Sequence, residues 1–314
     1  MPSLSKGSIH LFRIAGIDLY LHWSWFVVAI IEIQSRQGRY TSVAWNVLEY
    51  LALFLIVLTH EFGHALACRQ VGGTANRIML WPLGGVAYVD PPQRPGATLW
   101  SIAAGPLVNV ALLPVLGAAV LMGRSLGWQH SMHDAYVLMR SILAINIGLL
   151  VFNTLPIYPL DGGQILRSLL WFVMGRARSL LVATTLGILG VVGFFVLAAL
   201  AHSFWLGAIA AFMLMNCWGG LRHAQALLRR EKLPRREGFA CPNCGNKPLL
   251  GEYWRCNLCR QPFDTFLTGA VCPHCAKHFP TTVCVDCGKY FPMNDWVGGY
   301  VAGAGGVNGG FLSR

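Results

Sequence analysis

The sequence predicts a membrane α-helical protein: a core of six transmembrane helices with a small membrane-associated β-sheet, followed by a small cysteine-rich domain. Two observations support this fold class. Of the 314 residues, 55% are hydrophobic and 12% are charged, whereas soluble domains carry about 25% charged residues. Four C-x-x-C pairs, which hold eight of the ten cysteines, all lie after residue 240.

Apolar runs recur along the first 220 residues. Because a helix needs about 20 apolar residues to cross the hydrocarbon core, we expect six spans, the fourth of them interrupted: residues 18–34, 43–67, 97–122, 135–174, 180–201 and 203–220. The domains expected from this pattern are a core at residues 1–225, a basic linker at 226–239, a cysteine-rich domain at 240–292 and a glycine-rich, disordered tail at 293–314.

Membrane topology explains the net charge of +11 better than nucleic-acid binding does. Most arginines and lysines near the expected spans fall on one side if both ends of the chain are cytoplasmic. We therefore expect an integral, multi-pass protein of the inner or plasma membrane, with its basic linker near anionic lipid. This orientation places the cysteines in a reducing compartment, where C-x-x-C pairs favour zinc over disulfides.

Two short stretches predict β-strands, and the first of them runs into the start of the first expected span. Residues 9–14 and 17–21 flank a turn at Ala15 and Gly16. Residues 77–89 form two β runs around a Pro/Gly turn and are too broken to cross a bilayer. Open strand edges cannot face lipid, so we expect this hairpin to be covered by protein or to line a wet cavity. A simple cytoplasmic loop is the alternative.

The second span ends in an HExxH motif, His60-Glu61-Phe62-Gly63-His64. Residues four apart share one face of a helix, so both imidazoles can bind one ion, and Glu61 can reach a water on that ion. A charged side chain at mid-bilayer costs about 2.5–3.5 kcal/mol, whereas closing a structural zinc site contributes on the order of 10 kcal/mol. The motif therefore predicts a zinc site within the membrane.

A catalytic zinc site needs a third protein ligand and one open position for water. Asp161 is the candidate, because it lies in a stretch, residues 152–163, that two prolines and two glycines interrupt. Non-helical backbone at membrane depth is tolerated where it lines a cavity, so the interruption itself indicates a site. The alternative is that Asp161 lies at the cytoplasmic border and caps the helix after it.

The third span carries Gly105, Pro106 and Asn109. Small residues permit close approach of helices, and a membrane asparagine needs a buried hydrogen-bond partner. Taken alone, this stretch is typical of ordinary packing between membrane helices.

Together these blocks resemble the signature sequences of the site-2 protease family of intramembrane zinc metalloproteases. The resemblance covers about residues 9–225 and rests on the HExxH motif, on Gly84 and Gly85, on residues 105–109 and on the N-x-x-P-x-x-P-L-D-G block that begins at Asn153. It implies a six-helix core with a membrane-associated sheet. It also implies hydrolysis of peptide bonds in or beside transmembrane helices of substrates, as in regulated intramembrane proteolysis.

The resemblance also implies roles for single residues. Asp161 matches the third zinc ligand beside His60 and His64, and Asn153 matches a residue that aids catalysis or positions the substrate. The general base is expected to be Glu61. Because no insertion of PDZ-domain size is present, the chain resembles the compact branch of the family.

The four C-x-x-C pairs, separated by eleven, twelve and eight residues, predict two structural zinc sites. Two pairs supply four thiolates, which close a tetrahedral site and leave no position for chemistry. The pattern resembles a double zinc ribbon, which would need its metal to fold and whose partner could be a protein or a nucleic acid. We expect sequential rather than interleaved pairing: Cys241, Cys244, Cys256 and Cys259, then Cys272, Cys275, Cys284 and Cys287.

The sequence thus predicts a zinc-dependent intramembrane metalloendopeptidase with one catalytic and two structural Zn²⁺ ions, acting on transmembrane protein substrates in the lipid bilayer. The alternative is a non-proteolytic membrane protein that binds clients or senses zinc through its ribbons. Glu61 disfavours that alternative, because a binding module needs no general base. A zinc transporter would spread polar residues along a pathway, whereas these residues cluster.

Overall fold

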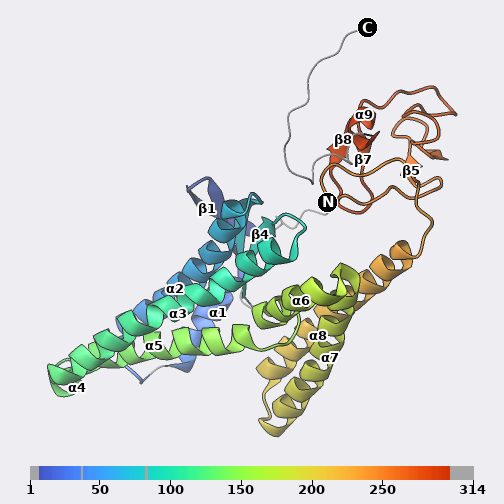
Figure 1. The fold of residues 1–314 in the computed structure, drawn as a ribbon. Helices are drawn as coiled ribbons and strands as arrows, with labels where there is room; N and C mark the ends of the chain where they lie inside the picture. Colours follow the sequence, from blue (N-terminus) through green and yellow to red (C-terminus); the bar gives the residue numbers. More distant parts are fainter. Residues whose placement is uncertain (1–6, 37, 82–83, 298–314) are drawn as a thin grey trace, which may run out of the picture. The chain divides into compact units, whose positions relative to one another are not determined.

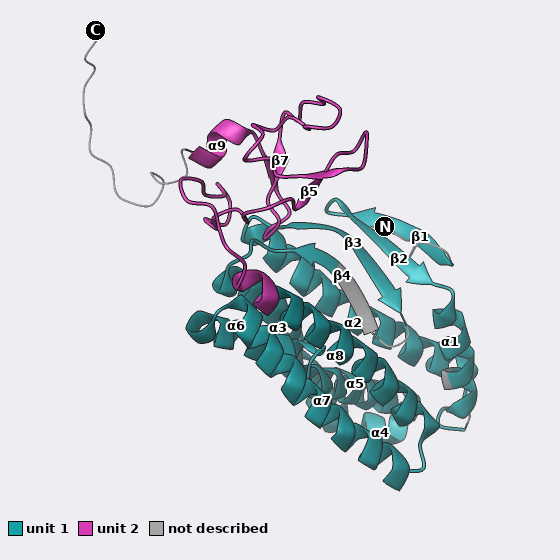
Figure 2. Cartoon of the chain, turned by 90° about the vertical axis from the view of Figure 1, so that its right-hand side faces the viewer, with its two compact units in different colours: residues 1–227 teal, residues 228–314 magenta. Residues whose placement is uncertain are grey.

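The computed structural model of the chain describes residues 7–36, 38–81 and 84–297 (Figure 1). The chain divides into two compact units, Met1–Leu227 and Leu228–Arg314 (Figure 2). Unit 1 consists of helices and one sheet, and unit 2 consists of short strands and turns with one short helix.

The helices of unit 1 are, in chain order, α1 (Ser24–Ser35), α2 (Val43–Gln70), α3 (Pro95–Ser125), α4 (Trp128–Ser131), α5 (His133–Thr154), α6 (Asp161–Met174), α7 (Arg176–Leu200) and α8 (Phe204–Glu231). Among the described residues, five of them are long and apolar enough to cross a membrane: α2, α3, α5, α7 and α8. The chain is therefore a helical membrane protein with five candidate spans rather than the six expected.

The difference lies in the first and fourth expected spans. Residues 17–22 form a strand, and α1 has 12 residues, which reach about 18 Å. The interrupted fourth span divides into α5, which is long enough to cross, and α6, which has 14 residues. An apolar run alone does not separate a strand followed by a short helix from one continuous helix.

The sheet of unit 1 has the order β1-β2-β3-β4: β1 (Ser8–Ile14), β2 (Ile17–His22), β3 (Thr74–Trp81) and β4 (Gly84–Asp90). The loop alternative for residues 77–89 is therefore wrong, since β3 and β4 pair antiparallel. Strand β2 pairs with β3 in parallel, and Asp18 lies opposite Arg77. Because β3 follows α2 directly, this pairing holds the N-terminal strands at the C-terminal end of α2.

The sheet packs on the last turns of α2. Every second residue of β2 is buried, and Ile17 and Leu19 lie in one apolar cluster with Ala65 and Cys68. Arg69 joins α2 to the sheet, because its guanidinium donates a hydrogen bond to the carbonyl oxygen of Ala75 in β3 at 2.9 Å. The half of α2 that carries the HExxH motif is therefore held between the sheet and the helices.

Unit 2 contains two small hairpins, formed by β5 (Trp254–Arg255) with β6 (Pro262–Phe263) and by β7 (Thr282–Val283) with β8 (Tyr290–Phe291), and helix α9 (Met293–Val297). Two expected boundaries shift. Helix α8 continues to Glu231 into the expected linker, and α9 lies in the expected tail, where Trp296 is 1% exposed in the core of unit 2. Residues 298–314 lie outside the described residues.

Candidate metal centres

The two histidines of the HExxH motif meet Asp161 from another helix. His60 and His64 lie one turn apart on α2, and Asp161 is the first residue of α6. The Nε2 atoms of the histidines are 3.1 Å apart, and Oδ2 of Asp161 lies 3.0 Å from Nε2 of His60 and 3.3 Å from Nε2 of His64. These three atoms lie close enough together to hold one metal ion.

The other nitrogen of each imidazole faces an oxygen that can only accept. Nδ1 of His60 lies 2.6 Å from Oδ1 of Asn109, and Nδ1 of His64 lies 2.9 Å from the carbonyl oxygen of Ser101. Each Nδ1 therefore carries the ring proton and donates it, which leaves a lone pair on each Nε2. Two such lone pairs beside a carboxylate form a donor set that fits a cation such as zinc.

A second asparagine fixes the orientation of Asn109. The Nδ2 group of Asn146 on α5 donates to the backbone carbonyl of Asn109 at 3.0 Å, so its Oδ1 accepts from Nδ2 of Asn109 at 2.8 Å. Only Oδ1 of Asn109 is then left to face His60. Both asparagines are 0% exposed. This role is not evident from the sequence, in which Asn109 is typical of a packing residue between membrane helices.

One face of α3 carries the residues that support the histidines. Ser101, Gly105 and Asn109 are spaced by four and are all buried, so they form a single stripe toward α2. A Cβ atom at Gly105 would overlap Nε2 of His64 and would lie 2.8 Å from Nε2 of His60. Gly105 therefore makes room for both imidazole rings. The four-residue spacing of Ser101, Gly105 and Asn109 is the feature of the sequence that indicates the supporting residues.

Two further glycines bring Asp161 into place. A Cβ atom at Gly162 would overlap the carbonyl oxygen of Thr154, and one at Gly163 would overlap the backbone nitrogen of Tyr158. The first turn of α6 can therefore pack directly on the chain that leaves α5. A carboxylate in the first turn also interacts favourably with the helix dipole, so Asp161 suits this end of the helix as well.

Two predicted catalytic residues lie close to this centre in the sequence. Glu61 follows His60 on α2, is 6% exposed, and lies near enough to His64 to interact with it electrostatically. Asn153 lies in the last turn of α5 and is half-buried. Within the described residues, no hydrogen bond from the Asn153 side chain is found, and its role stays a prediction.

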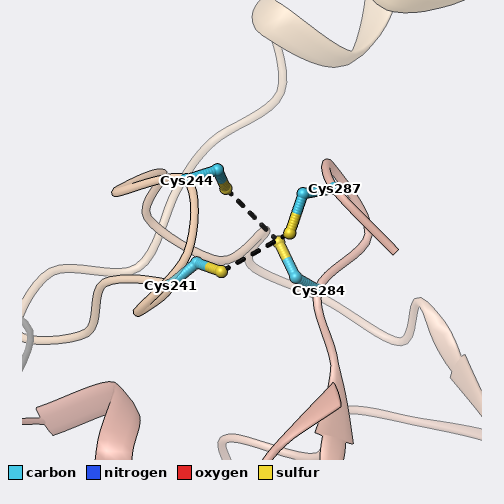
Figure 3. Close-up of side chains that lie close together, drawn as sticks. All are labelled: Cys241, Cys244, Cys284 and Cys287. Carbon is cyan, nitrogen blue, oxygen red and sulfur yellow. Dashed lines mark hydrogen bonds between the residues drawn. The ribbon is translucent and has the colours of Figure 1, made fainter. Parts of the chain in front are cut away.

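The eight cysteines of the C-x-x-C pairs form two groups in unit 2. The first group is Cys241, Cys244, Cys284 and Cys287 (Figure 3), and the second is Cys256, Cys259, Cys272 and Cys275. Within each group the sulfur atoms lie within 4.8 Å of one another, as four ligands of a single metal ion would.

The predicted pairing of these cysteines is wrong. The first C-x-x-C pair meets the fourth, with Sγ of Cys241 3.6 Å from Sγ of Cys287, and the second pair meets the third, with Sγ of Cys256 3.6 Å from Sγ of Cys275. The pairing is nested, neither sequential nor interleaved. An ion pair supports part of it, because Arg235, six residues before Cys241, donates to Oδ2 of Asp286 within the fourth pair.

Zinc counts in double variants should reveal the nested pairing. We expect Cys241→Ser with Cys287→Ser to remove one zinc ion per chain, because both thiolates belong to one group. Cys241→Ser with Cys256→Ser should remove two. Metal analysis of the purified chains measures both counts, and sequential pairing requires the opposite result.

Each C-x-x-C pair has the same local structure. The backbone N–H four residues after the first cysteine donates back to the carbonyl of that cysteine, at 2.8–3.0 Å in all four turns. The residue that donates has positive φ each time: Gly245 (71°), Arg260 (60°), Ala276 (57°) and Gly288 (72°). Left-handed backbone favours glycine, so Arg260 and Ala276 hold strained positions.

Replacing Ala276 with glycine should strengthen metal binding by unit 2. The substitution removes about 1 kcal/mol of backbone strain, which corresponds to about fivefold tighter zinc retention. Competition with a chelator at equilibrium measures it. Gly288→Ala is the matched control. A Cβ there has open space around it, so any effect comes from the positive φ alone. We expect this variant to retain zinc about fivefold more weakly than the wild type. Tighter retention in Gly288→Ala would contradict the argument.

Two arginines of the expected linker are part of unit 2. Arg235 donates to Oδ2 of Asp286 at 2.7 Å, and Arg236 donates to Oδ2 of Asp264 at 2.6 Å. The hydrogen bond to Asp286 raises the pKa of Arg235 above its ordinary value. Since Asp286 lies within the fourth C-x-x-C pair, this ion pair connects the start of the unit to the cysteines of the first group.

Comparison with known proteins gives a family and several relatives. The model of peptidase family M50 matches residues 49–136 and 128–200. The zinc metalloprotease MJ0392 of Methanocaldococcus jannaschii is 33% identical over 180 residues, which are 57% of this chain and 50% of that protein. The putative zinc metalloprotease sll0528 of Synechocystis is 27% identical over 321 residues, which cover 90% of this chain and 82% of that protein.

Two other similarities complete the comparison. Stage IV sporulation protein FB of Bacillus subtilis is 36% identical over 118 residues, 37% of this chain and 38% of that protein. The solved structure of a site-2 protease from M. jannaschii covers 68% of this chain and 95% of its own, with 27% identity and a TM-score of 0.48. The chain spans about half the length of MJ0392.

Proposed function

This chain belongs to the site-2 protease family within peptidase family M50, and from that premise we propose that it is an intramembrane zinc metalloendopeptidase. Its substrates would be membrane proteins cut in or beside a transmembrane segment. The observation that supports the proposal most is the meeting of His60, His64 and Asp161, whose three ligand atoms lie within 3.3 Å of one another beside Glu61.

The residues divide into ligands, supports and a proton carrier. In the proposal Nε2 of His60, Nε2 of His64 and Oδ2 of Asp161 hold the ion, and a zinc ion bound there would polarise the scissile carbonyl and lower the pKa of a bound water. Glu61 accepts a proton from the attacking water and returns it to the leaving amine. The Nδ1 hydrogen bonds of both histidines keep their lone pairs on the ion.

Depth and charge support a site near the cytoplasmic side. From His64 to the end of α2 is six residues, or about 9 Å, and Arg69 and Arg77 follow at that end. The N-terminal strands lie at the same end, because β2 pairs with β3. The proposal therefore keeps both termini in the cytoplasm, and the chain between β2 and α2, which includes α1, would then cross the membrane as a sixth, shorter span. Water could reach the site from there, as hydrolysis requires.

A helical substrate must unwind before its peptide bond can be attacked, and its freed backbone groups need new partners. Within the described residues β4 is an edge strand of the sheet, paired with β3 alone. We propose that an unwound segment of substrate adds to this edge, because strand addition supplies main-chain hydrogen bonds with little demand on sequence.

Cleavage of a labelled membrane substrate by the wild type, compared with Glu61→Gln at equal zinc content, tests the proposed function. A protein that binds clients or senses zinc without proteolysis would release no product in either form. In this proposal the cysteine groups of unit 2 are two structural zinc sites, so the wild type should carry three zinc ions per chain.

A further inference from the structure

Unit 1 contains a second polar cavity, of about 540 Å³, apart from the proposed metal centre. The connection between β4 and α3 forms one wall, and α6, α7 and α8 form the others. None of His60, His64 and Asp161 lines it. The cavity could therefore bind a ligand independently of the metal centre.

Two arginines meet in this cavity. Arg167 of α6 and Arg176, the first residue of α7, each place the guanidinium carbon 5.9 Å from the centre of the Trp171 ring. Two positive charges thus share one aromatic ring, and all three side chains line the cavity. Cation–π contact with Trp171 stabilises each arginine in part, but it provides no countercharge.

The charge of these arginines is not balanced nearby. The Nε atoms of Arg167 and Arg176 are buried and have no hydrogen-bond partner. Within the described residues, no carboxylate lies within 4.0 Å of either guanidinium, and Asp90 is the one acidic residue among those that line the cavity. A buried donor without a partner costs about 1–3 kcal/mol, and more when the group is charged. An anion in the cavity would balance the charge of the two guanidinium groups.

Membrane topology alone does not explain these two side chains. Arg178, two residues further along α7, is exposed, as a residue that merely sets orientation would be. Arg167 and Arg176 are instead half-buried and turned to one ring. The pair therefore differs from Arg178 in sharing one aromatic ring at the wall of a cavity.

Helix length indicates the depth at which the cavity would lie in a bilayer. Helix α7 has 25 residues and reaches about 37 Å, which exceeds the hydrocarbon core of about 30 Å. If α7 spans the core, its first residue, Arg176, would lie at the level of the headgroups, where a bilayer carries phosphate. The apolar side chains of Ile102, Leu180 and Met215 line the same cavity and could contact the glycerol and upper acyl part of a lipid.

We propose that this cavity binds the phosphate group of an anionic phospholipid, with Arg167 and Arg176 donating to the phosphate oxygens. The planar guanidinium presents paired donors that match phosphate geometry, and two of them can hold one phosphate from two sides. The lipid would join the end of α6 to the start of α7 and so steady the helix that begins at Asp161. Proteolytic activity is not needed for this binding.

The test measures lipid binding by the purified full-length chain in neutral detergent. We expect native mass spectrometry to retain one phosphatidylglycerol per chain, and added phosphatidylglycerol, unlike phosphatidylcholine, to raise the melting temperature. Arg167→Gln and Arg176→Gln should each weaken binding about tenfold or more, since each removes hydrogen bonds to a charged group. Arg178→Gln is the matched control and should bind as the wild type does.

The phosphate group could come from a lipid or from a soluble anion. Adding inorganic phosphate at constant ionic strength and measuring the melting temperature distinguishes these two sources. Stabilisation by phosphate with the same dependence on Arg167 and Arg176 supports the site and assigns it to a soluble anion rather than a lipid. Equal binding of phosphatidylglycerol by the wild type and both variants, or no binding at all, overturns the proposal. If Arg167→Gln loses its zinc and does not fold, Arg167→Lys is the variant to test. The lysine ammonium cannot make the paired hydrogen bonds of a guanidinium to phosphate, so Arg167→Lys should bind the lipid clearly more weakly than the wild type.

Discussion

Replacing Glu61 with glutamine is expected to slow peptide-bond cleavage by about 10²- to 10⁴-fold while the chain keeps its zinc. Glutamine has nearly the shape of glutamate but cannot take the proton of an attacking water at neutral pH. Because Glu61 is not among the three grouped ligand atoms, the metal should stay. Product release from a labelled membrane substrate and metal analysis of the same preparation measure the two quantities.

The same substitution elsewhere on α2 provides a control. Glu49 is also buried, at 3% exposed, and its carboxylate accepts a hydrogen bond from the Tyr40 hydroxyl at 2.6 Å. Glu49→Gln removes a buried negative charge from the same helix, so it should lower stability and leave the rate per folded molecule within a few-fold. Cleavage by Glu61→Gln at the wild-type rate would assign the proton transfer to another group.

Loss of zinc from Glu61→Gln would have a different meaning. It would place Glu61 in the ligand set or in the support of that set, and the assignment of Asp161 would then need revision. The two measurements therefore separate a failure of the mechanism from a failure of the site.

The sequence alone indicates the three candidate ligands, but it does not indicate the residues that hold the two histidines in place. The HExxH spacing by itself places His60 and His64 on one helical face, and the interrupted stretch draws attention to Asp161. The partner of Asn109 could not be found in this way, because His60 is 49 residues away and nothing local indicates the contact. The stripe of Ser101, Gly105 and Asn109 becomes meaningful once two helices are known to touch.

The nested cysteine groups show a second limit of the sequence. Each C-x-x-C turn is a local structure and can be recognised from four residues, but four such turns can close two sites in more than one way. The choice depends on contacts between distant segments, such as the ion pair of Arg235 with Asp286, which joins the segment of the first pair to the fourth pair. Such contacts join distant segments and leave no pattern in spacing.

The first expected span, residues 18–34, differs from the structure at its start. Residues 17–22 are apolar at every second position, and they continue into the apolar helix α1. Strand and helix then form one hydrophobic run of nearly the length of a membrane span. The local hairpin with β1 is predicted from the sequence, whereas the pairing of this strand with β3, more than fifty residues away, is seen only in the folded chain.

Replacing Gly105 with alanine is expected to remove the catalytic zinc and, with it, cleavage. The new Cβ would overlap Nε2 of His64 and would press on Nε2 of His60 at 2.8 Å. Neither ring can turn away freely, because Asn109 and the carbonyl of Ser101 hold the opposite nitrogen of each. Metal analysis should then find two zinc ions per chain, both in unit 2, and cleavage should fall to background.

The same helix offers a matched control for this substitution. Gly117 is also in α3, and a Cβ there would meet no atom within 4 Å. Gly117→Ala should keep three zinc ions and normal cleavage, and alanine should stabilise the helix by up to about 1 kcal/mol. If Gly105→Ala retains three zinc ions and full activity, the rings do not lie against α3 as described, and the lone pairs of the two histidines cannot converge on Asp161.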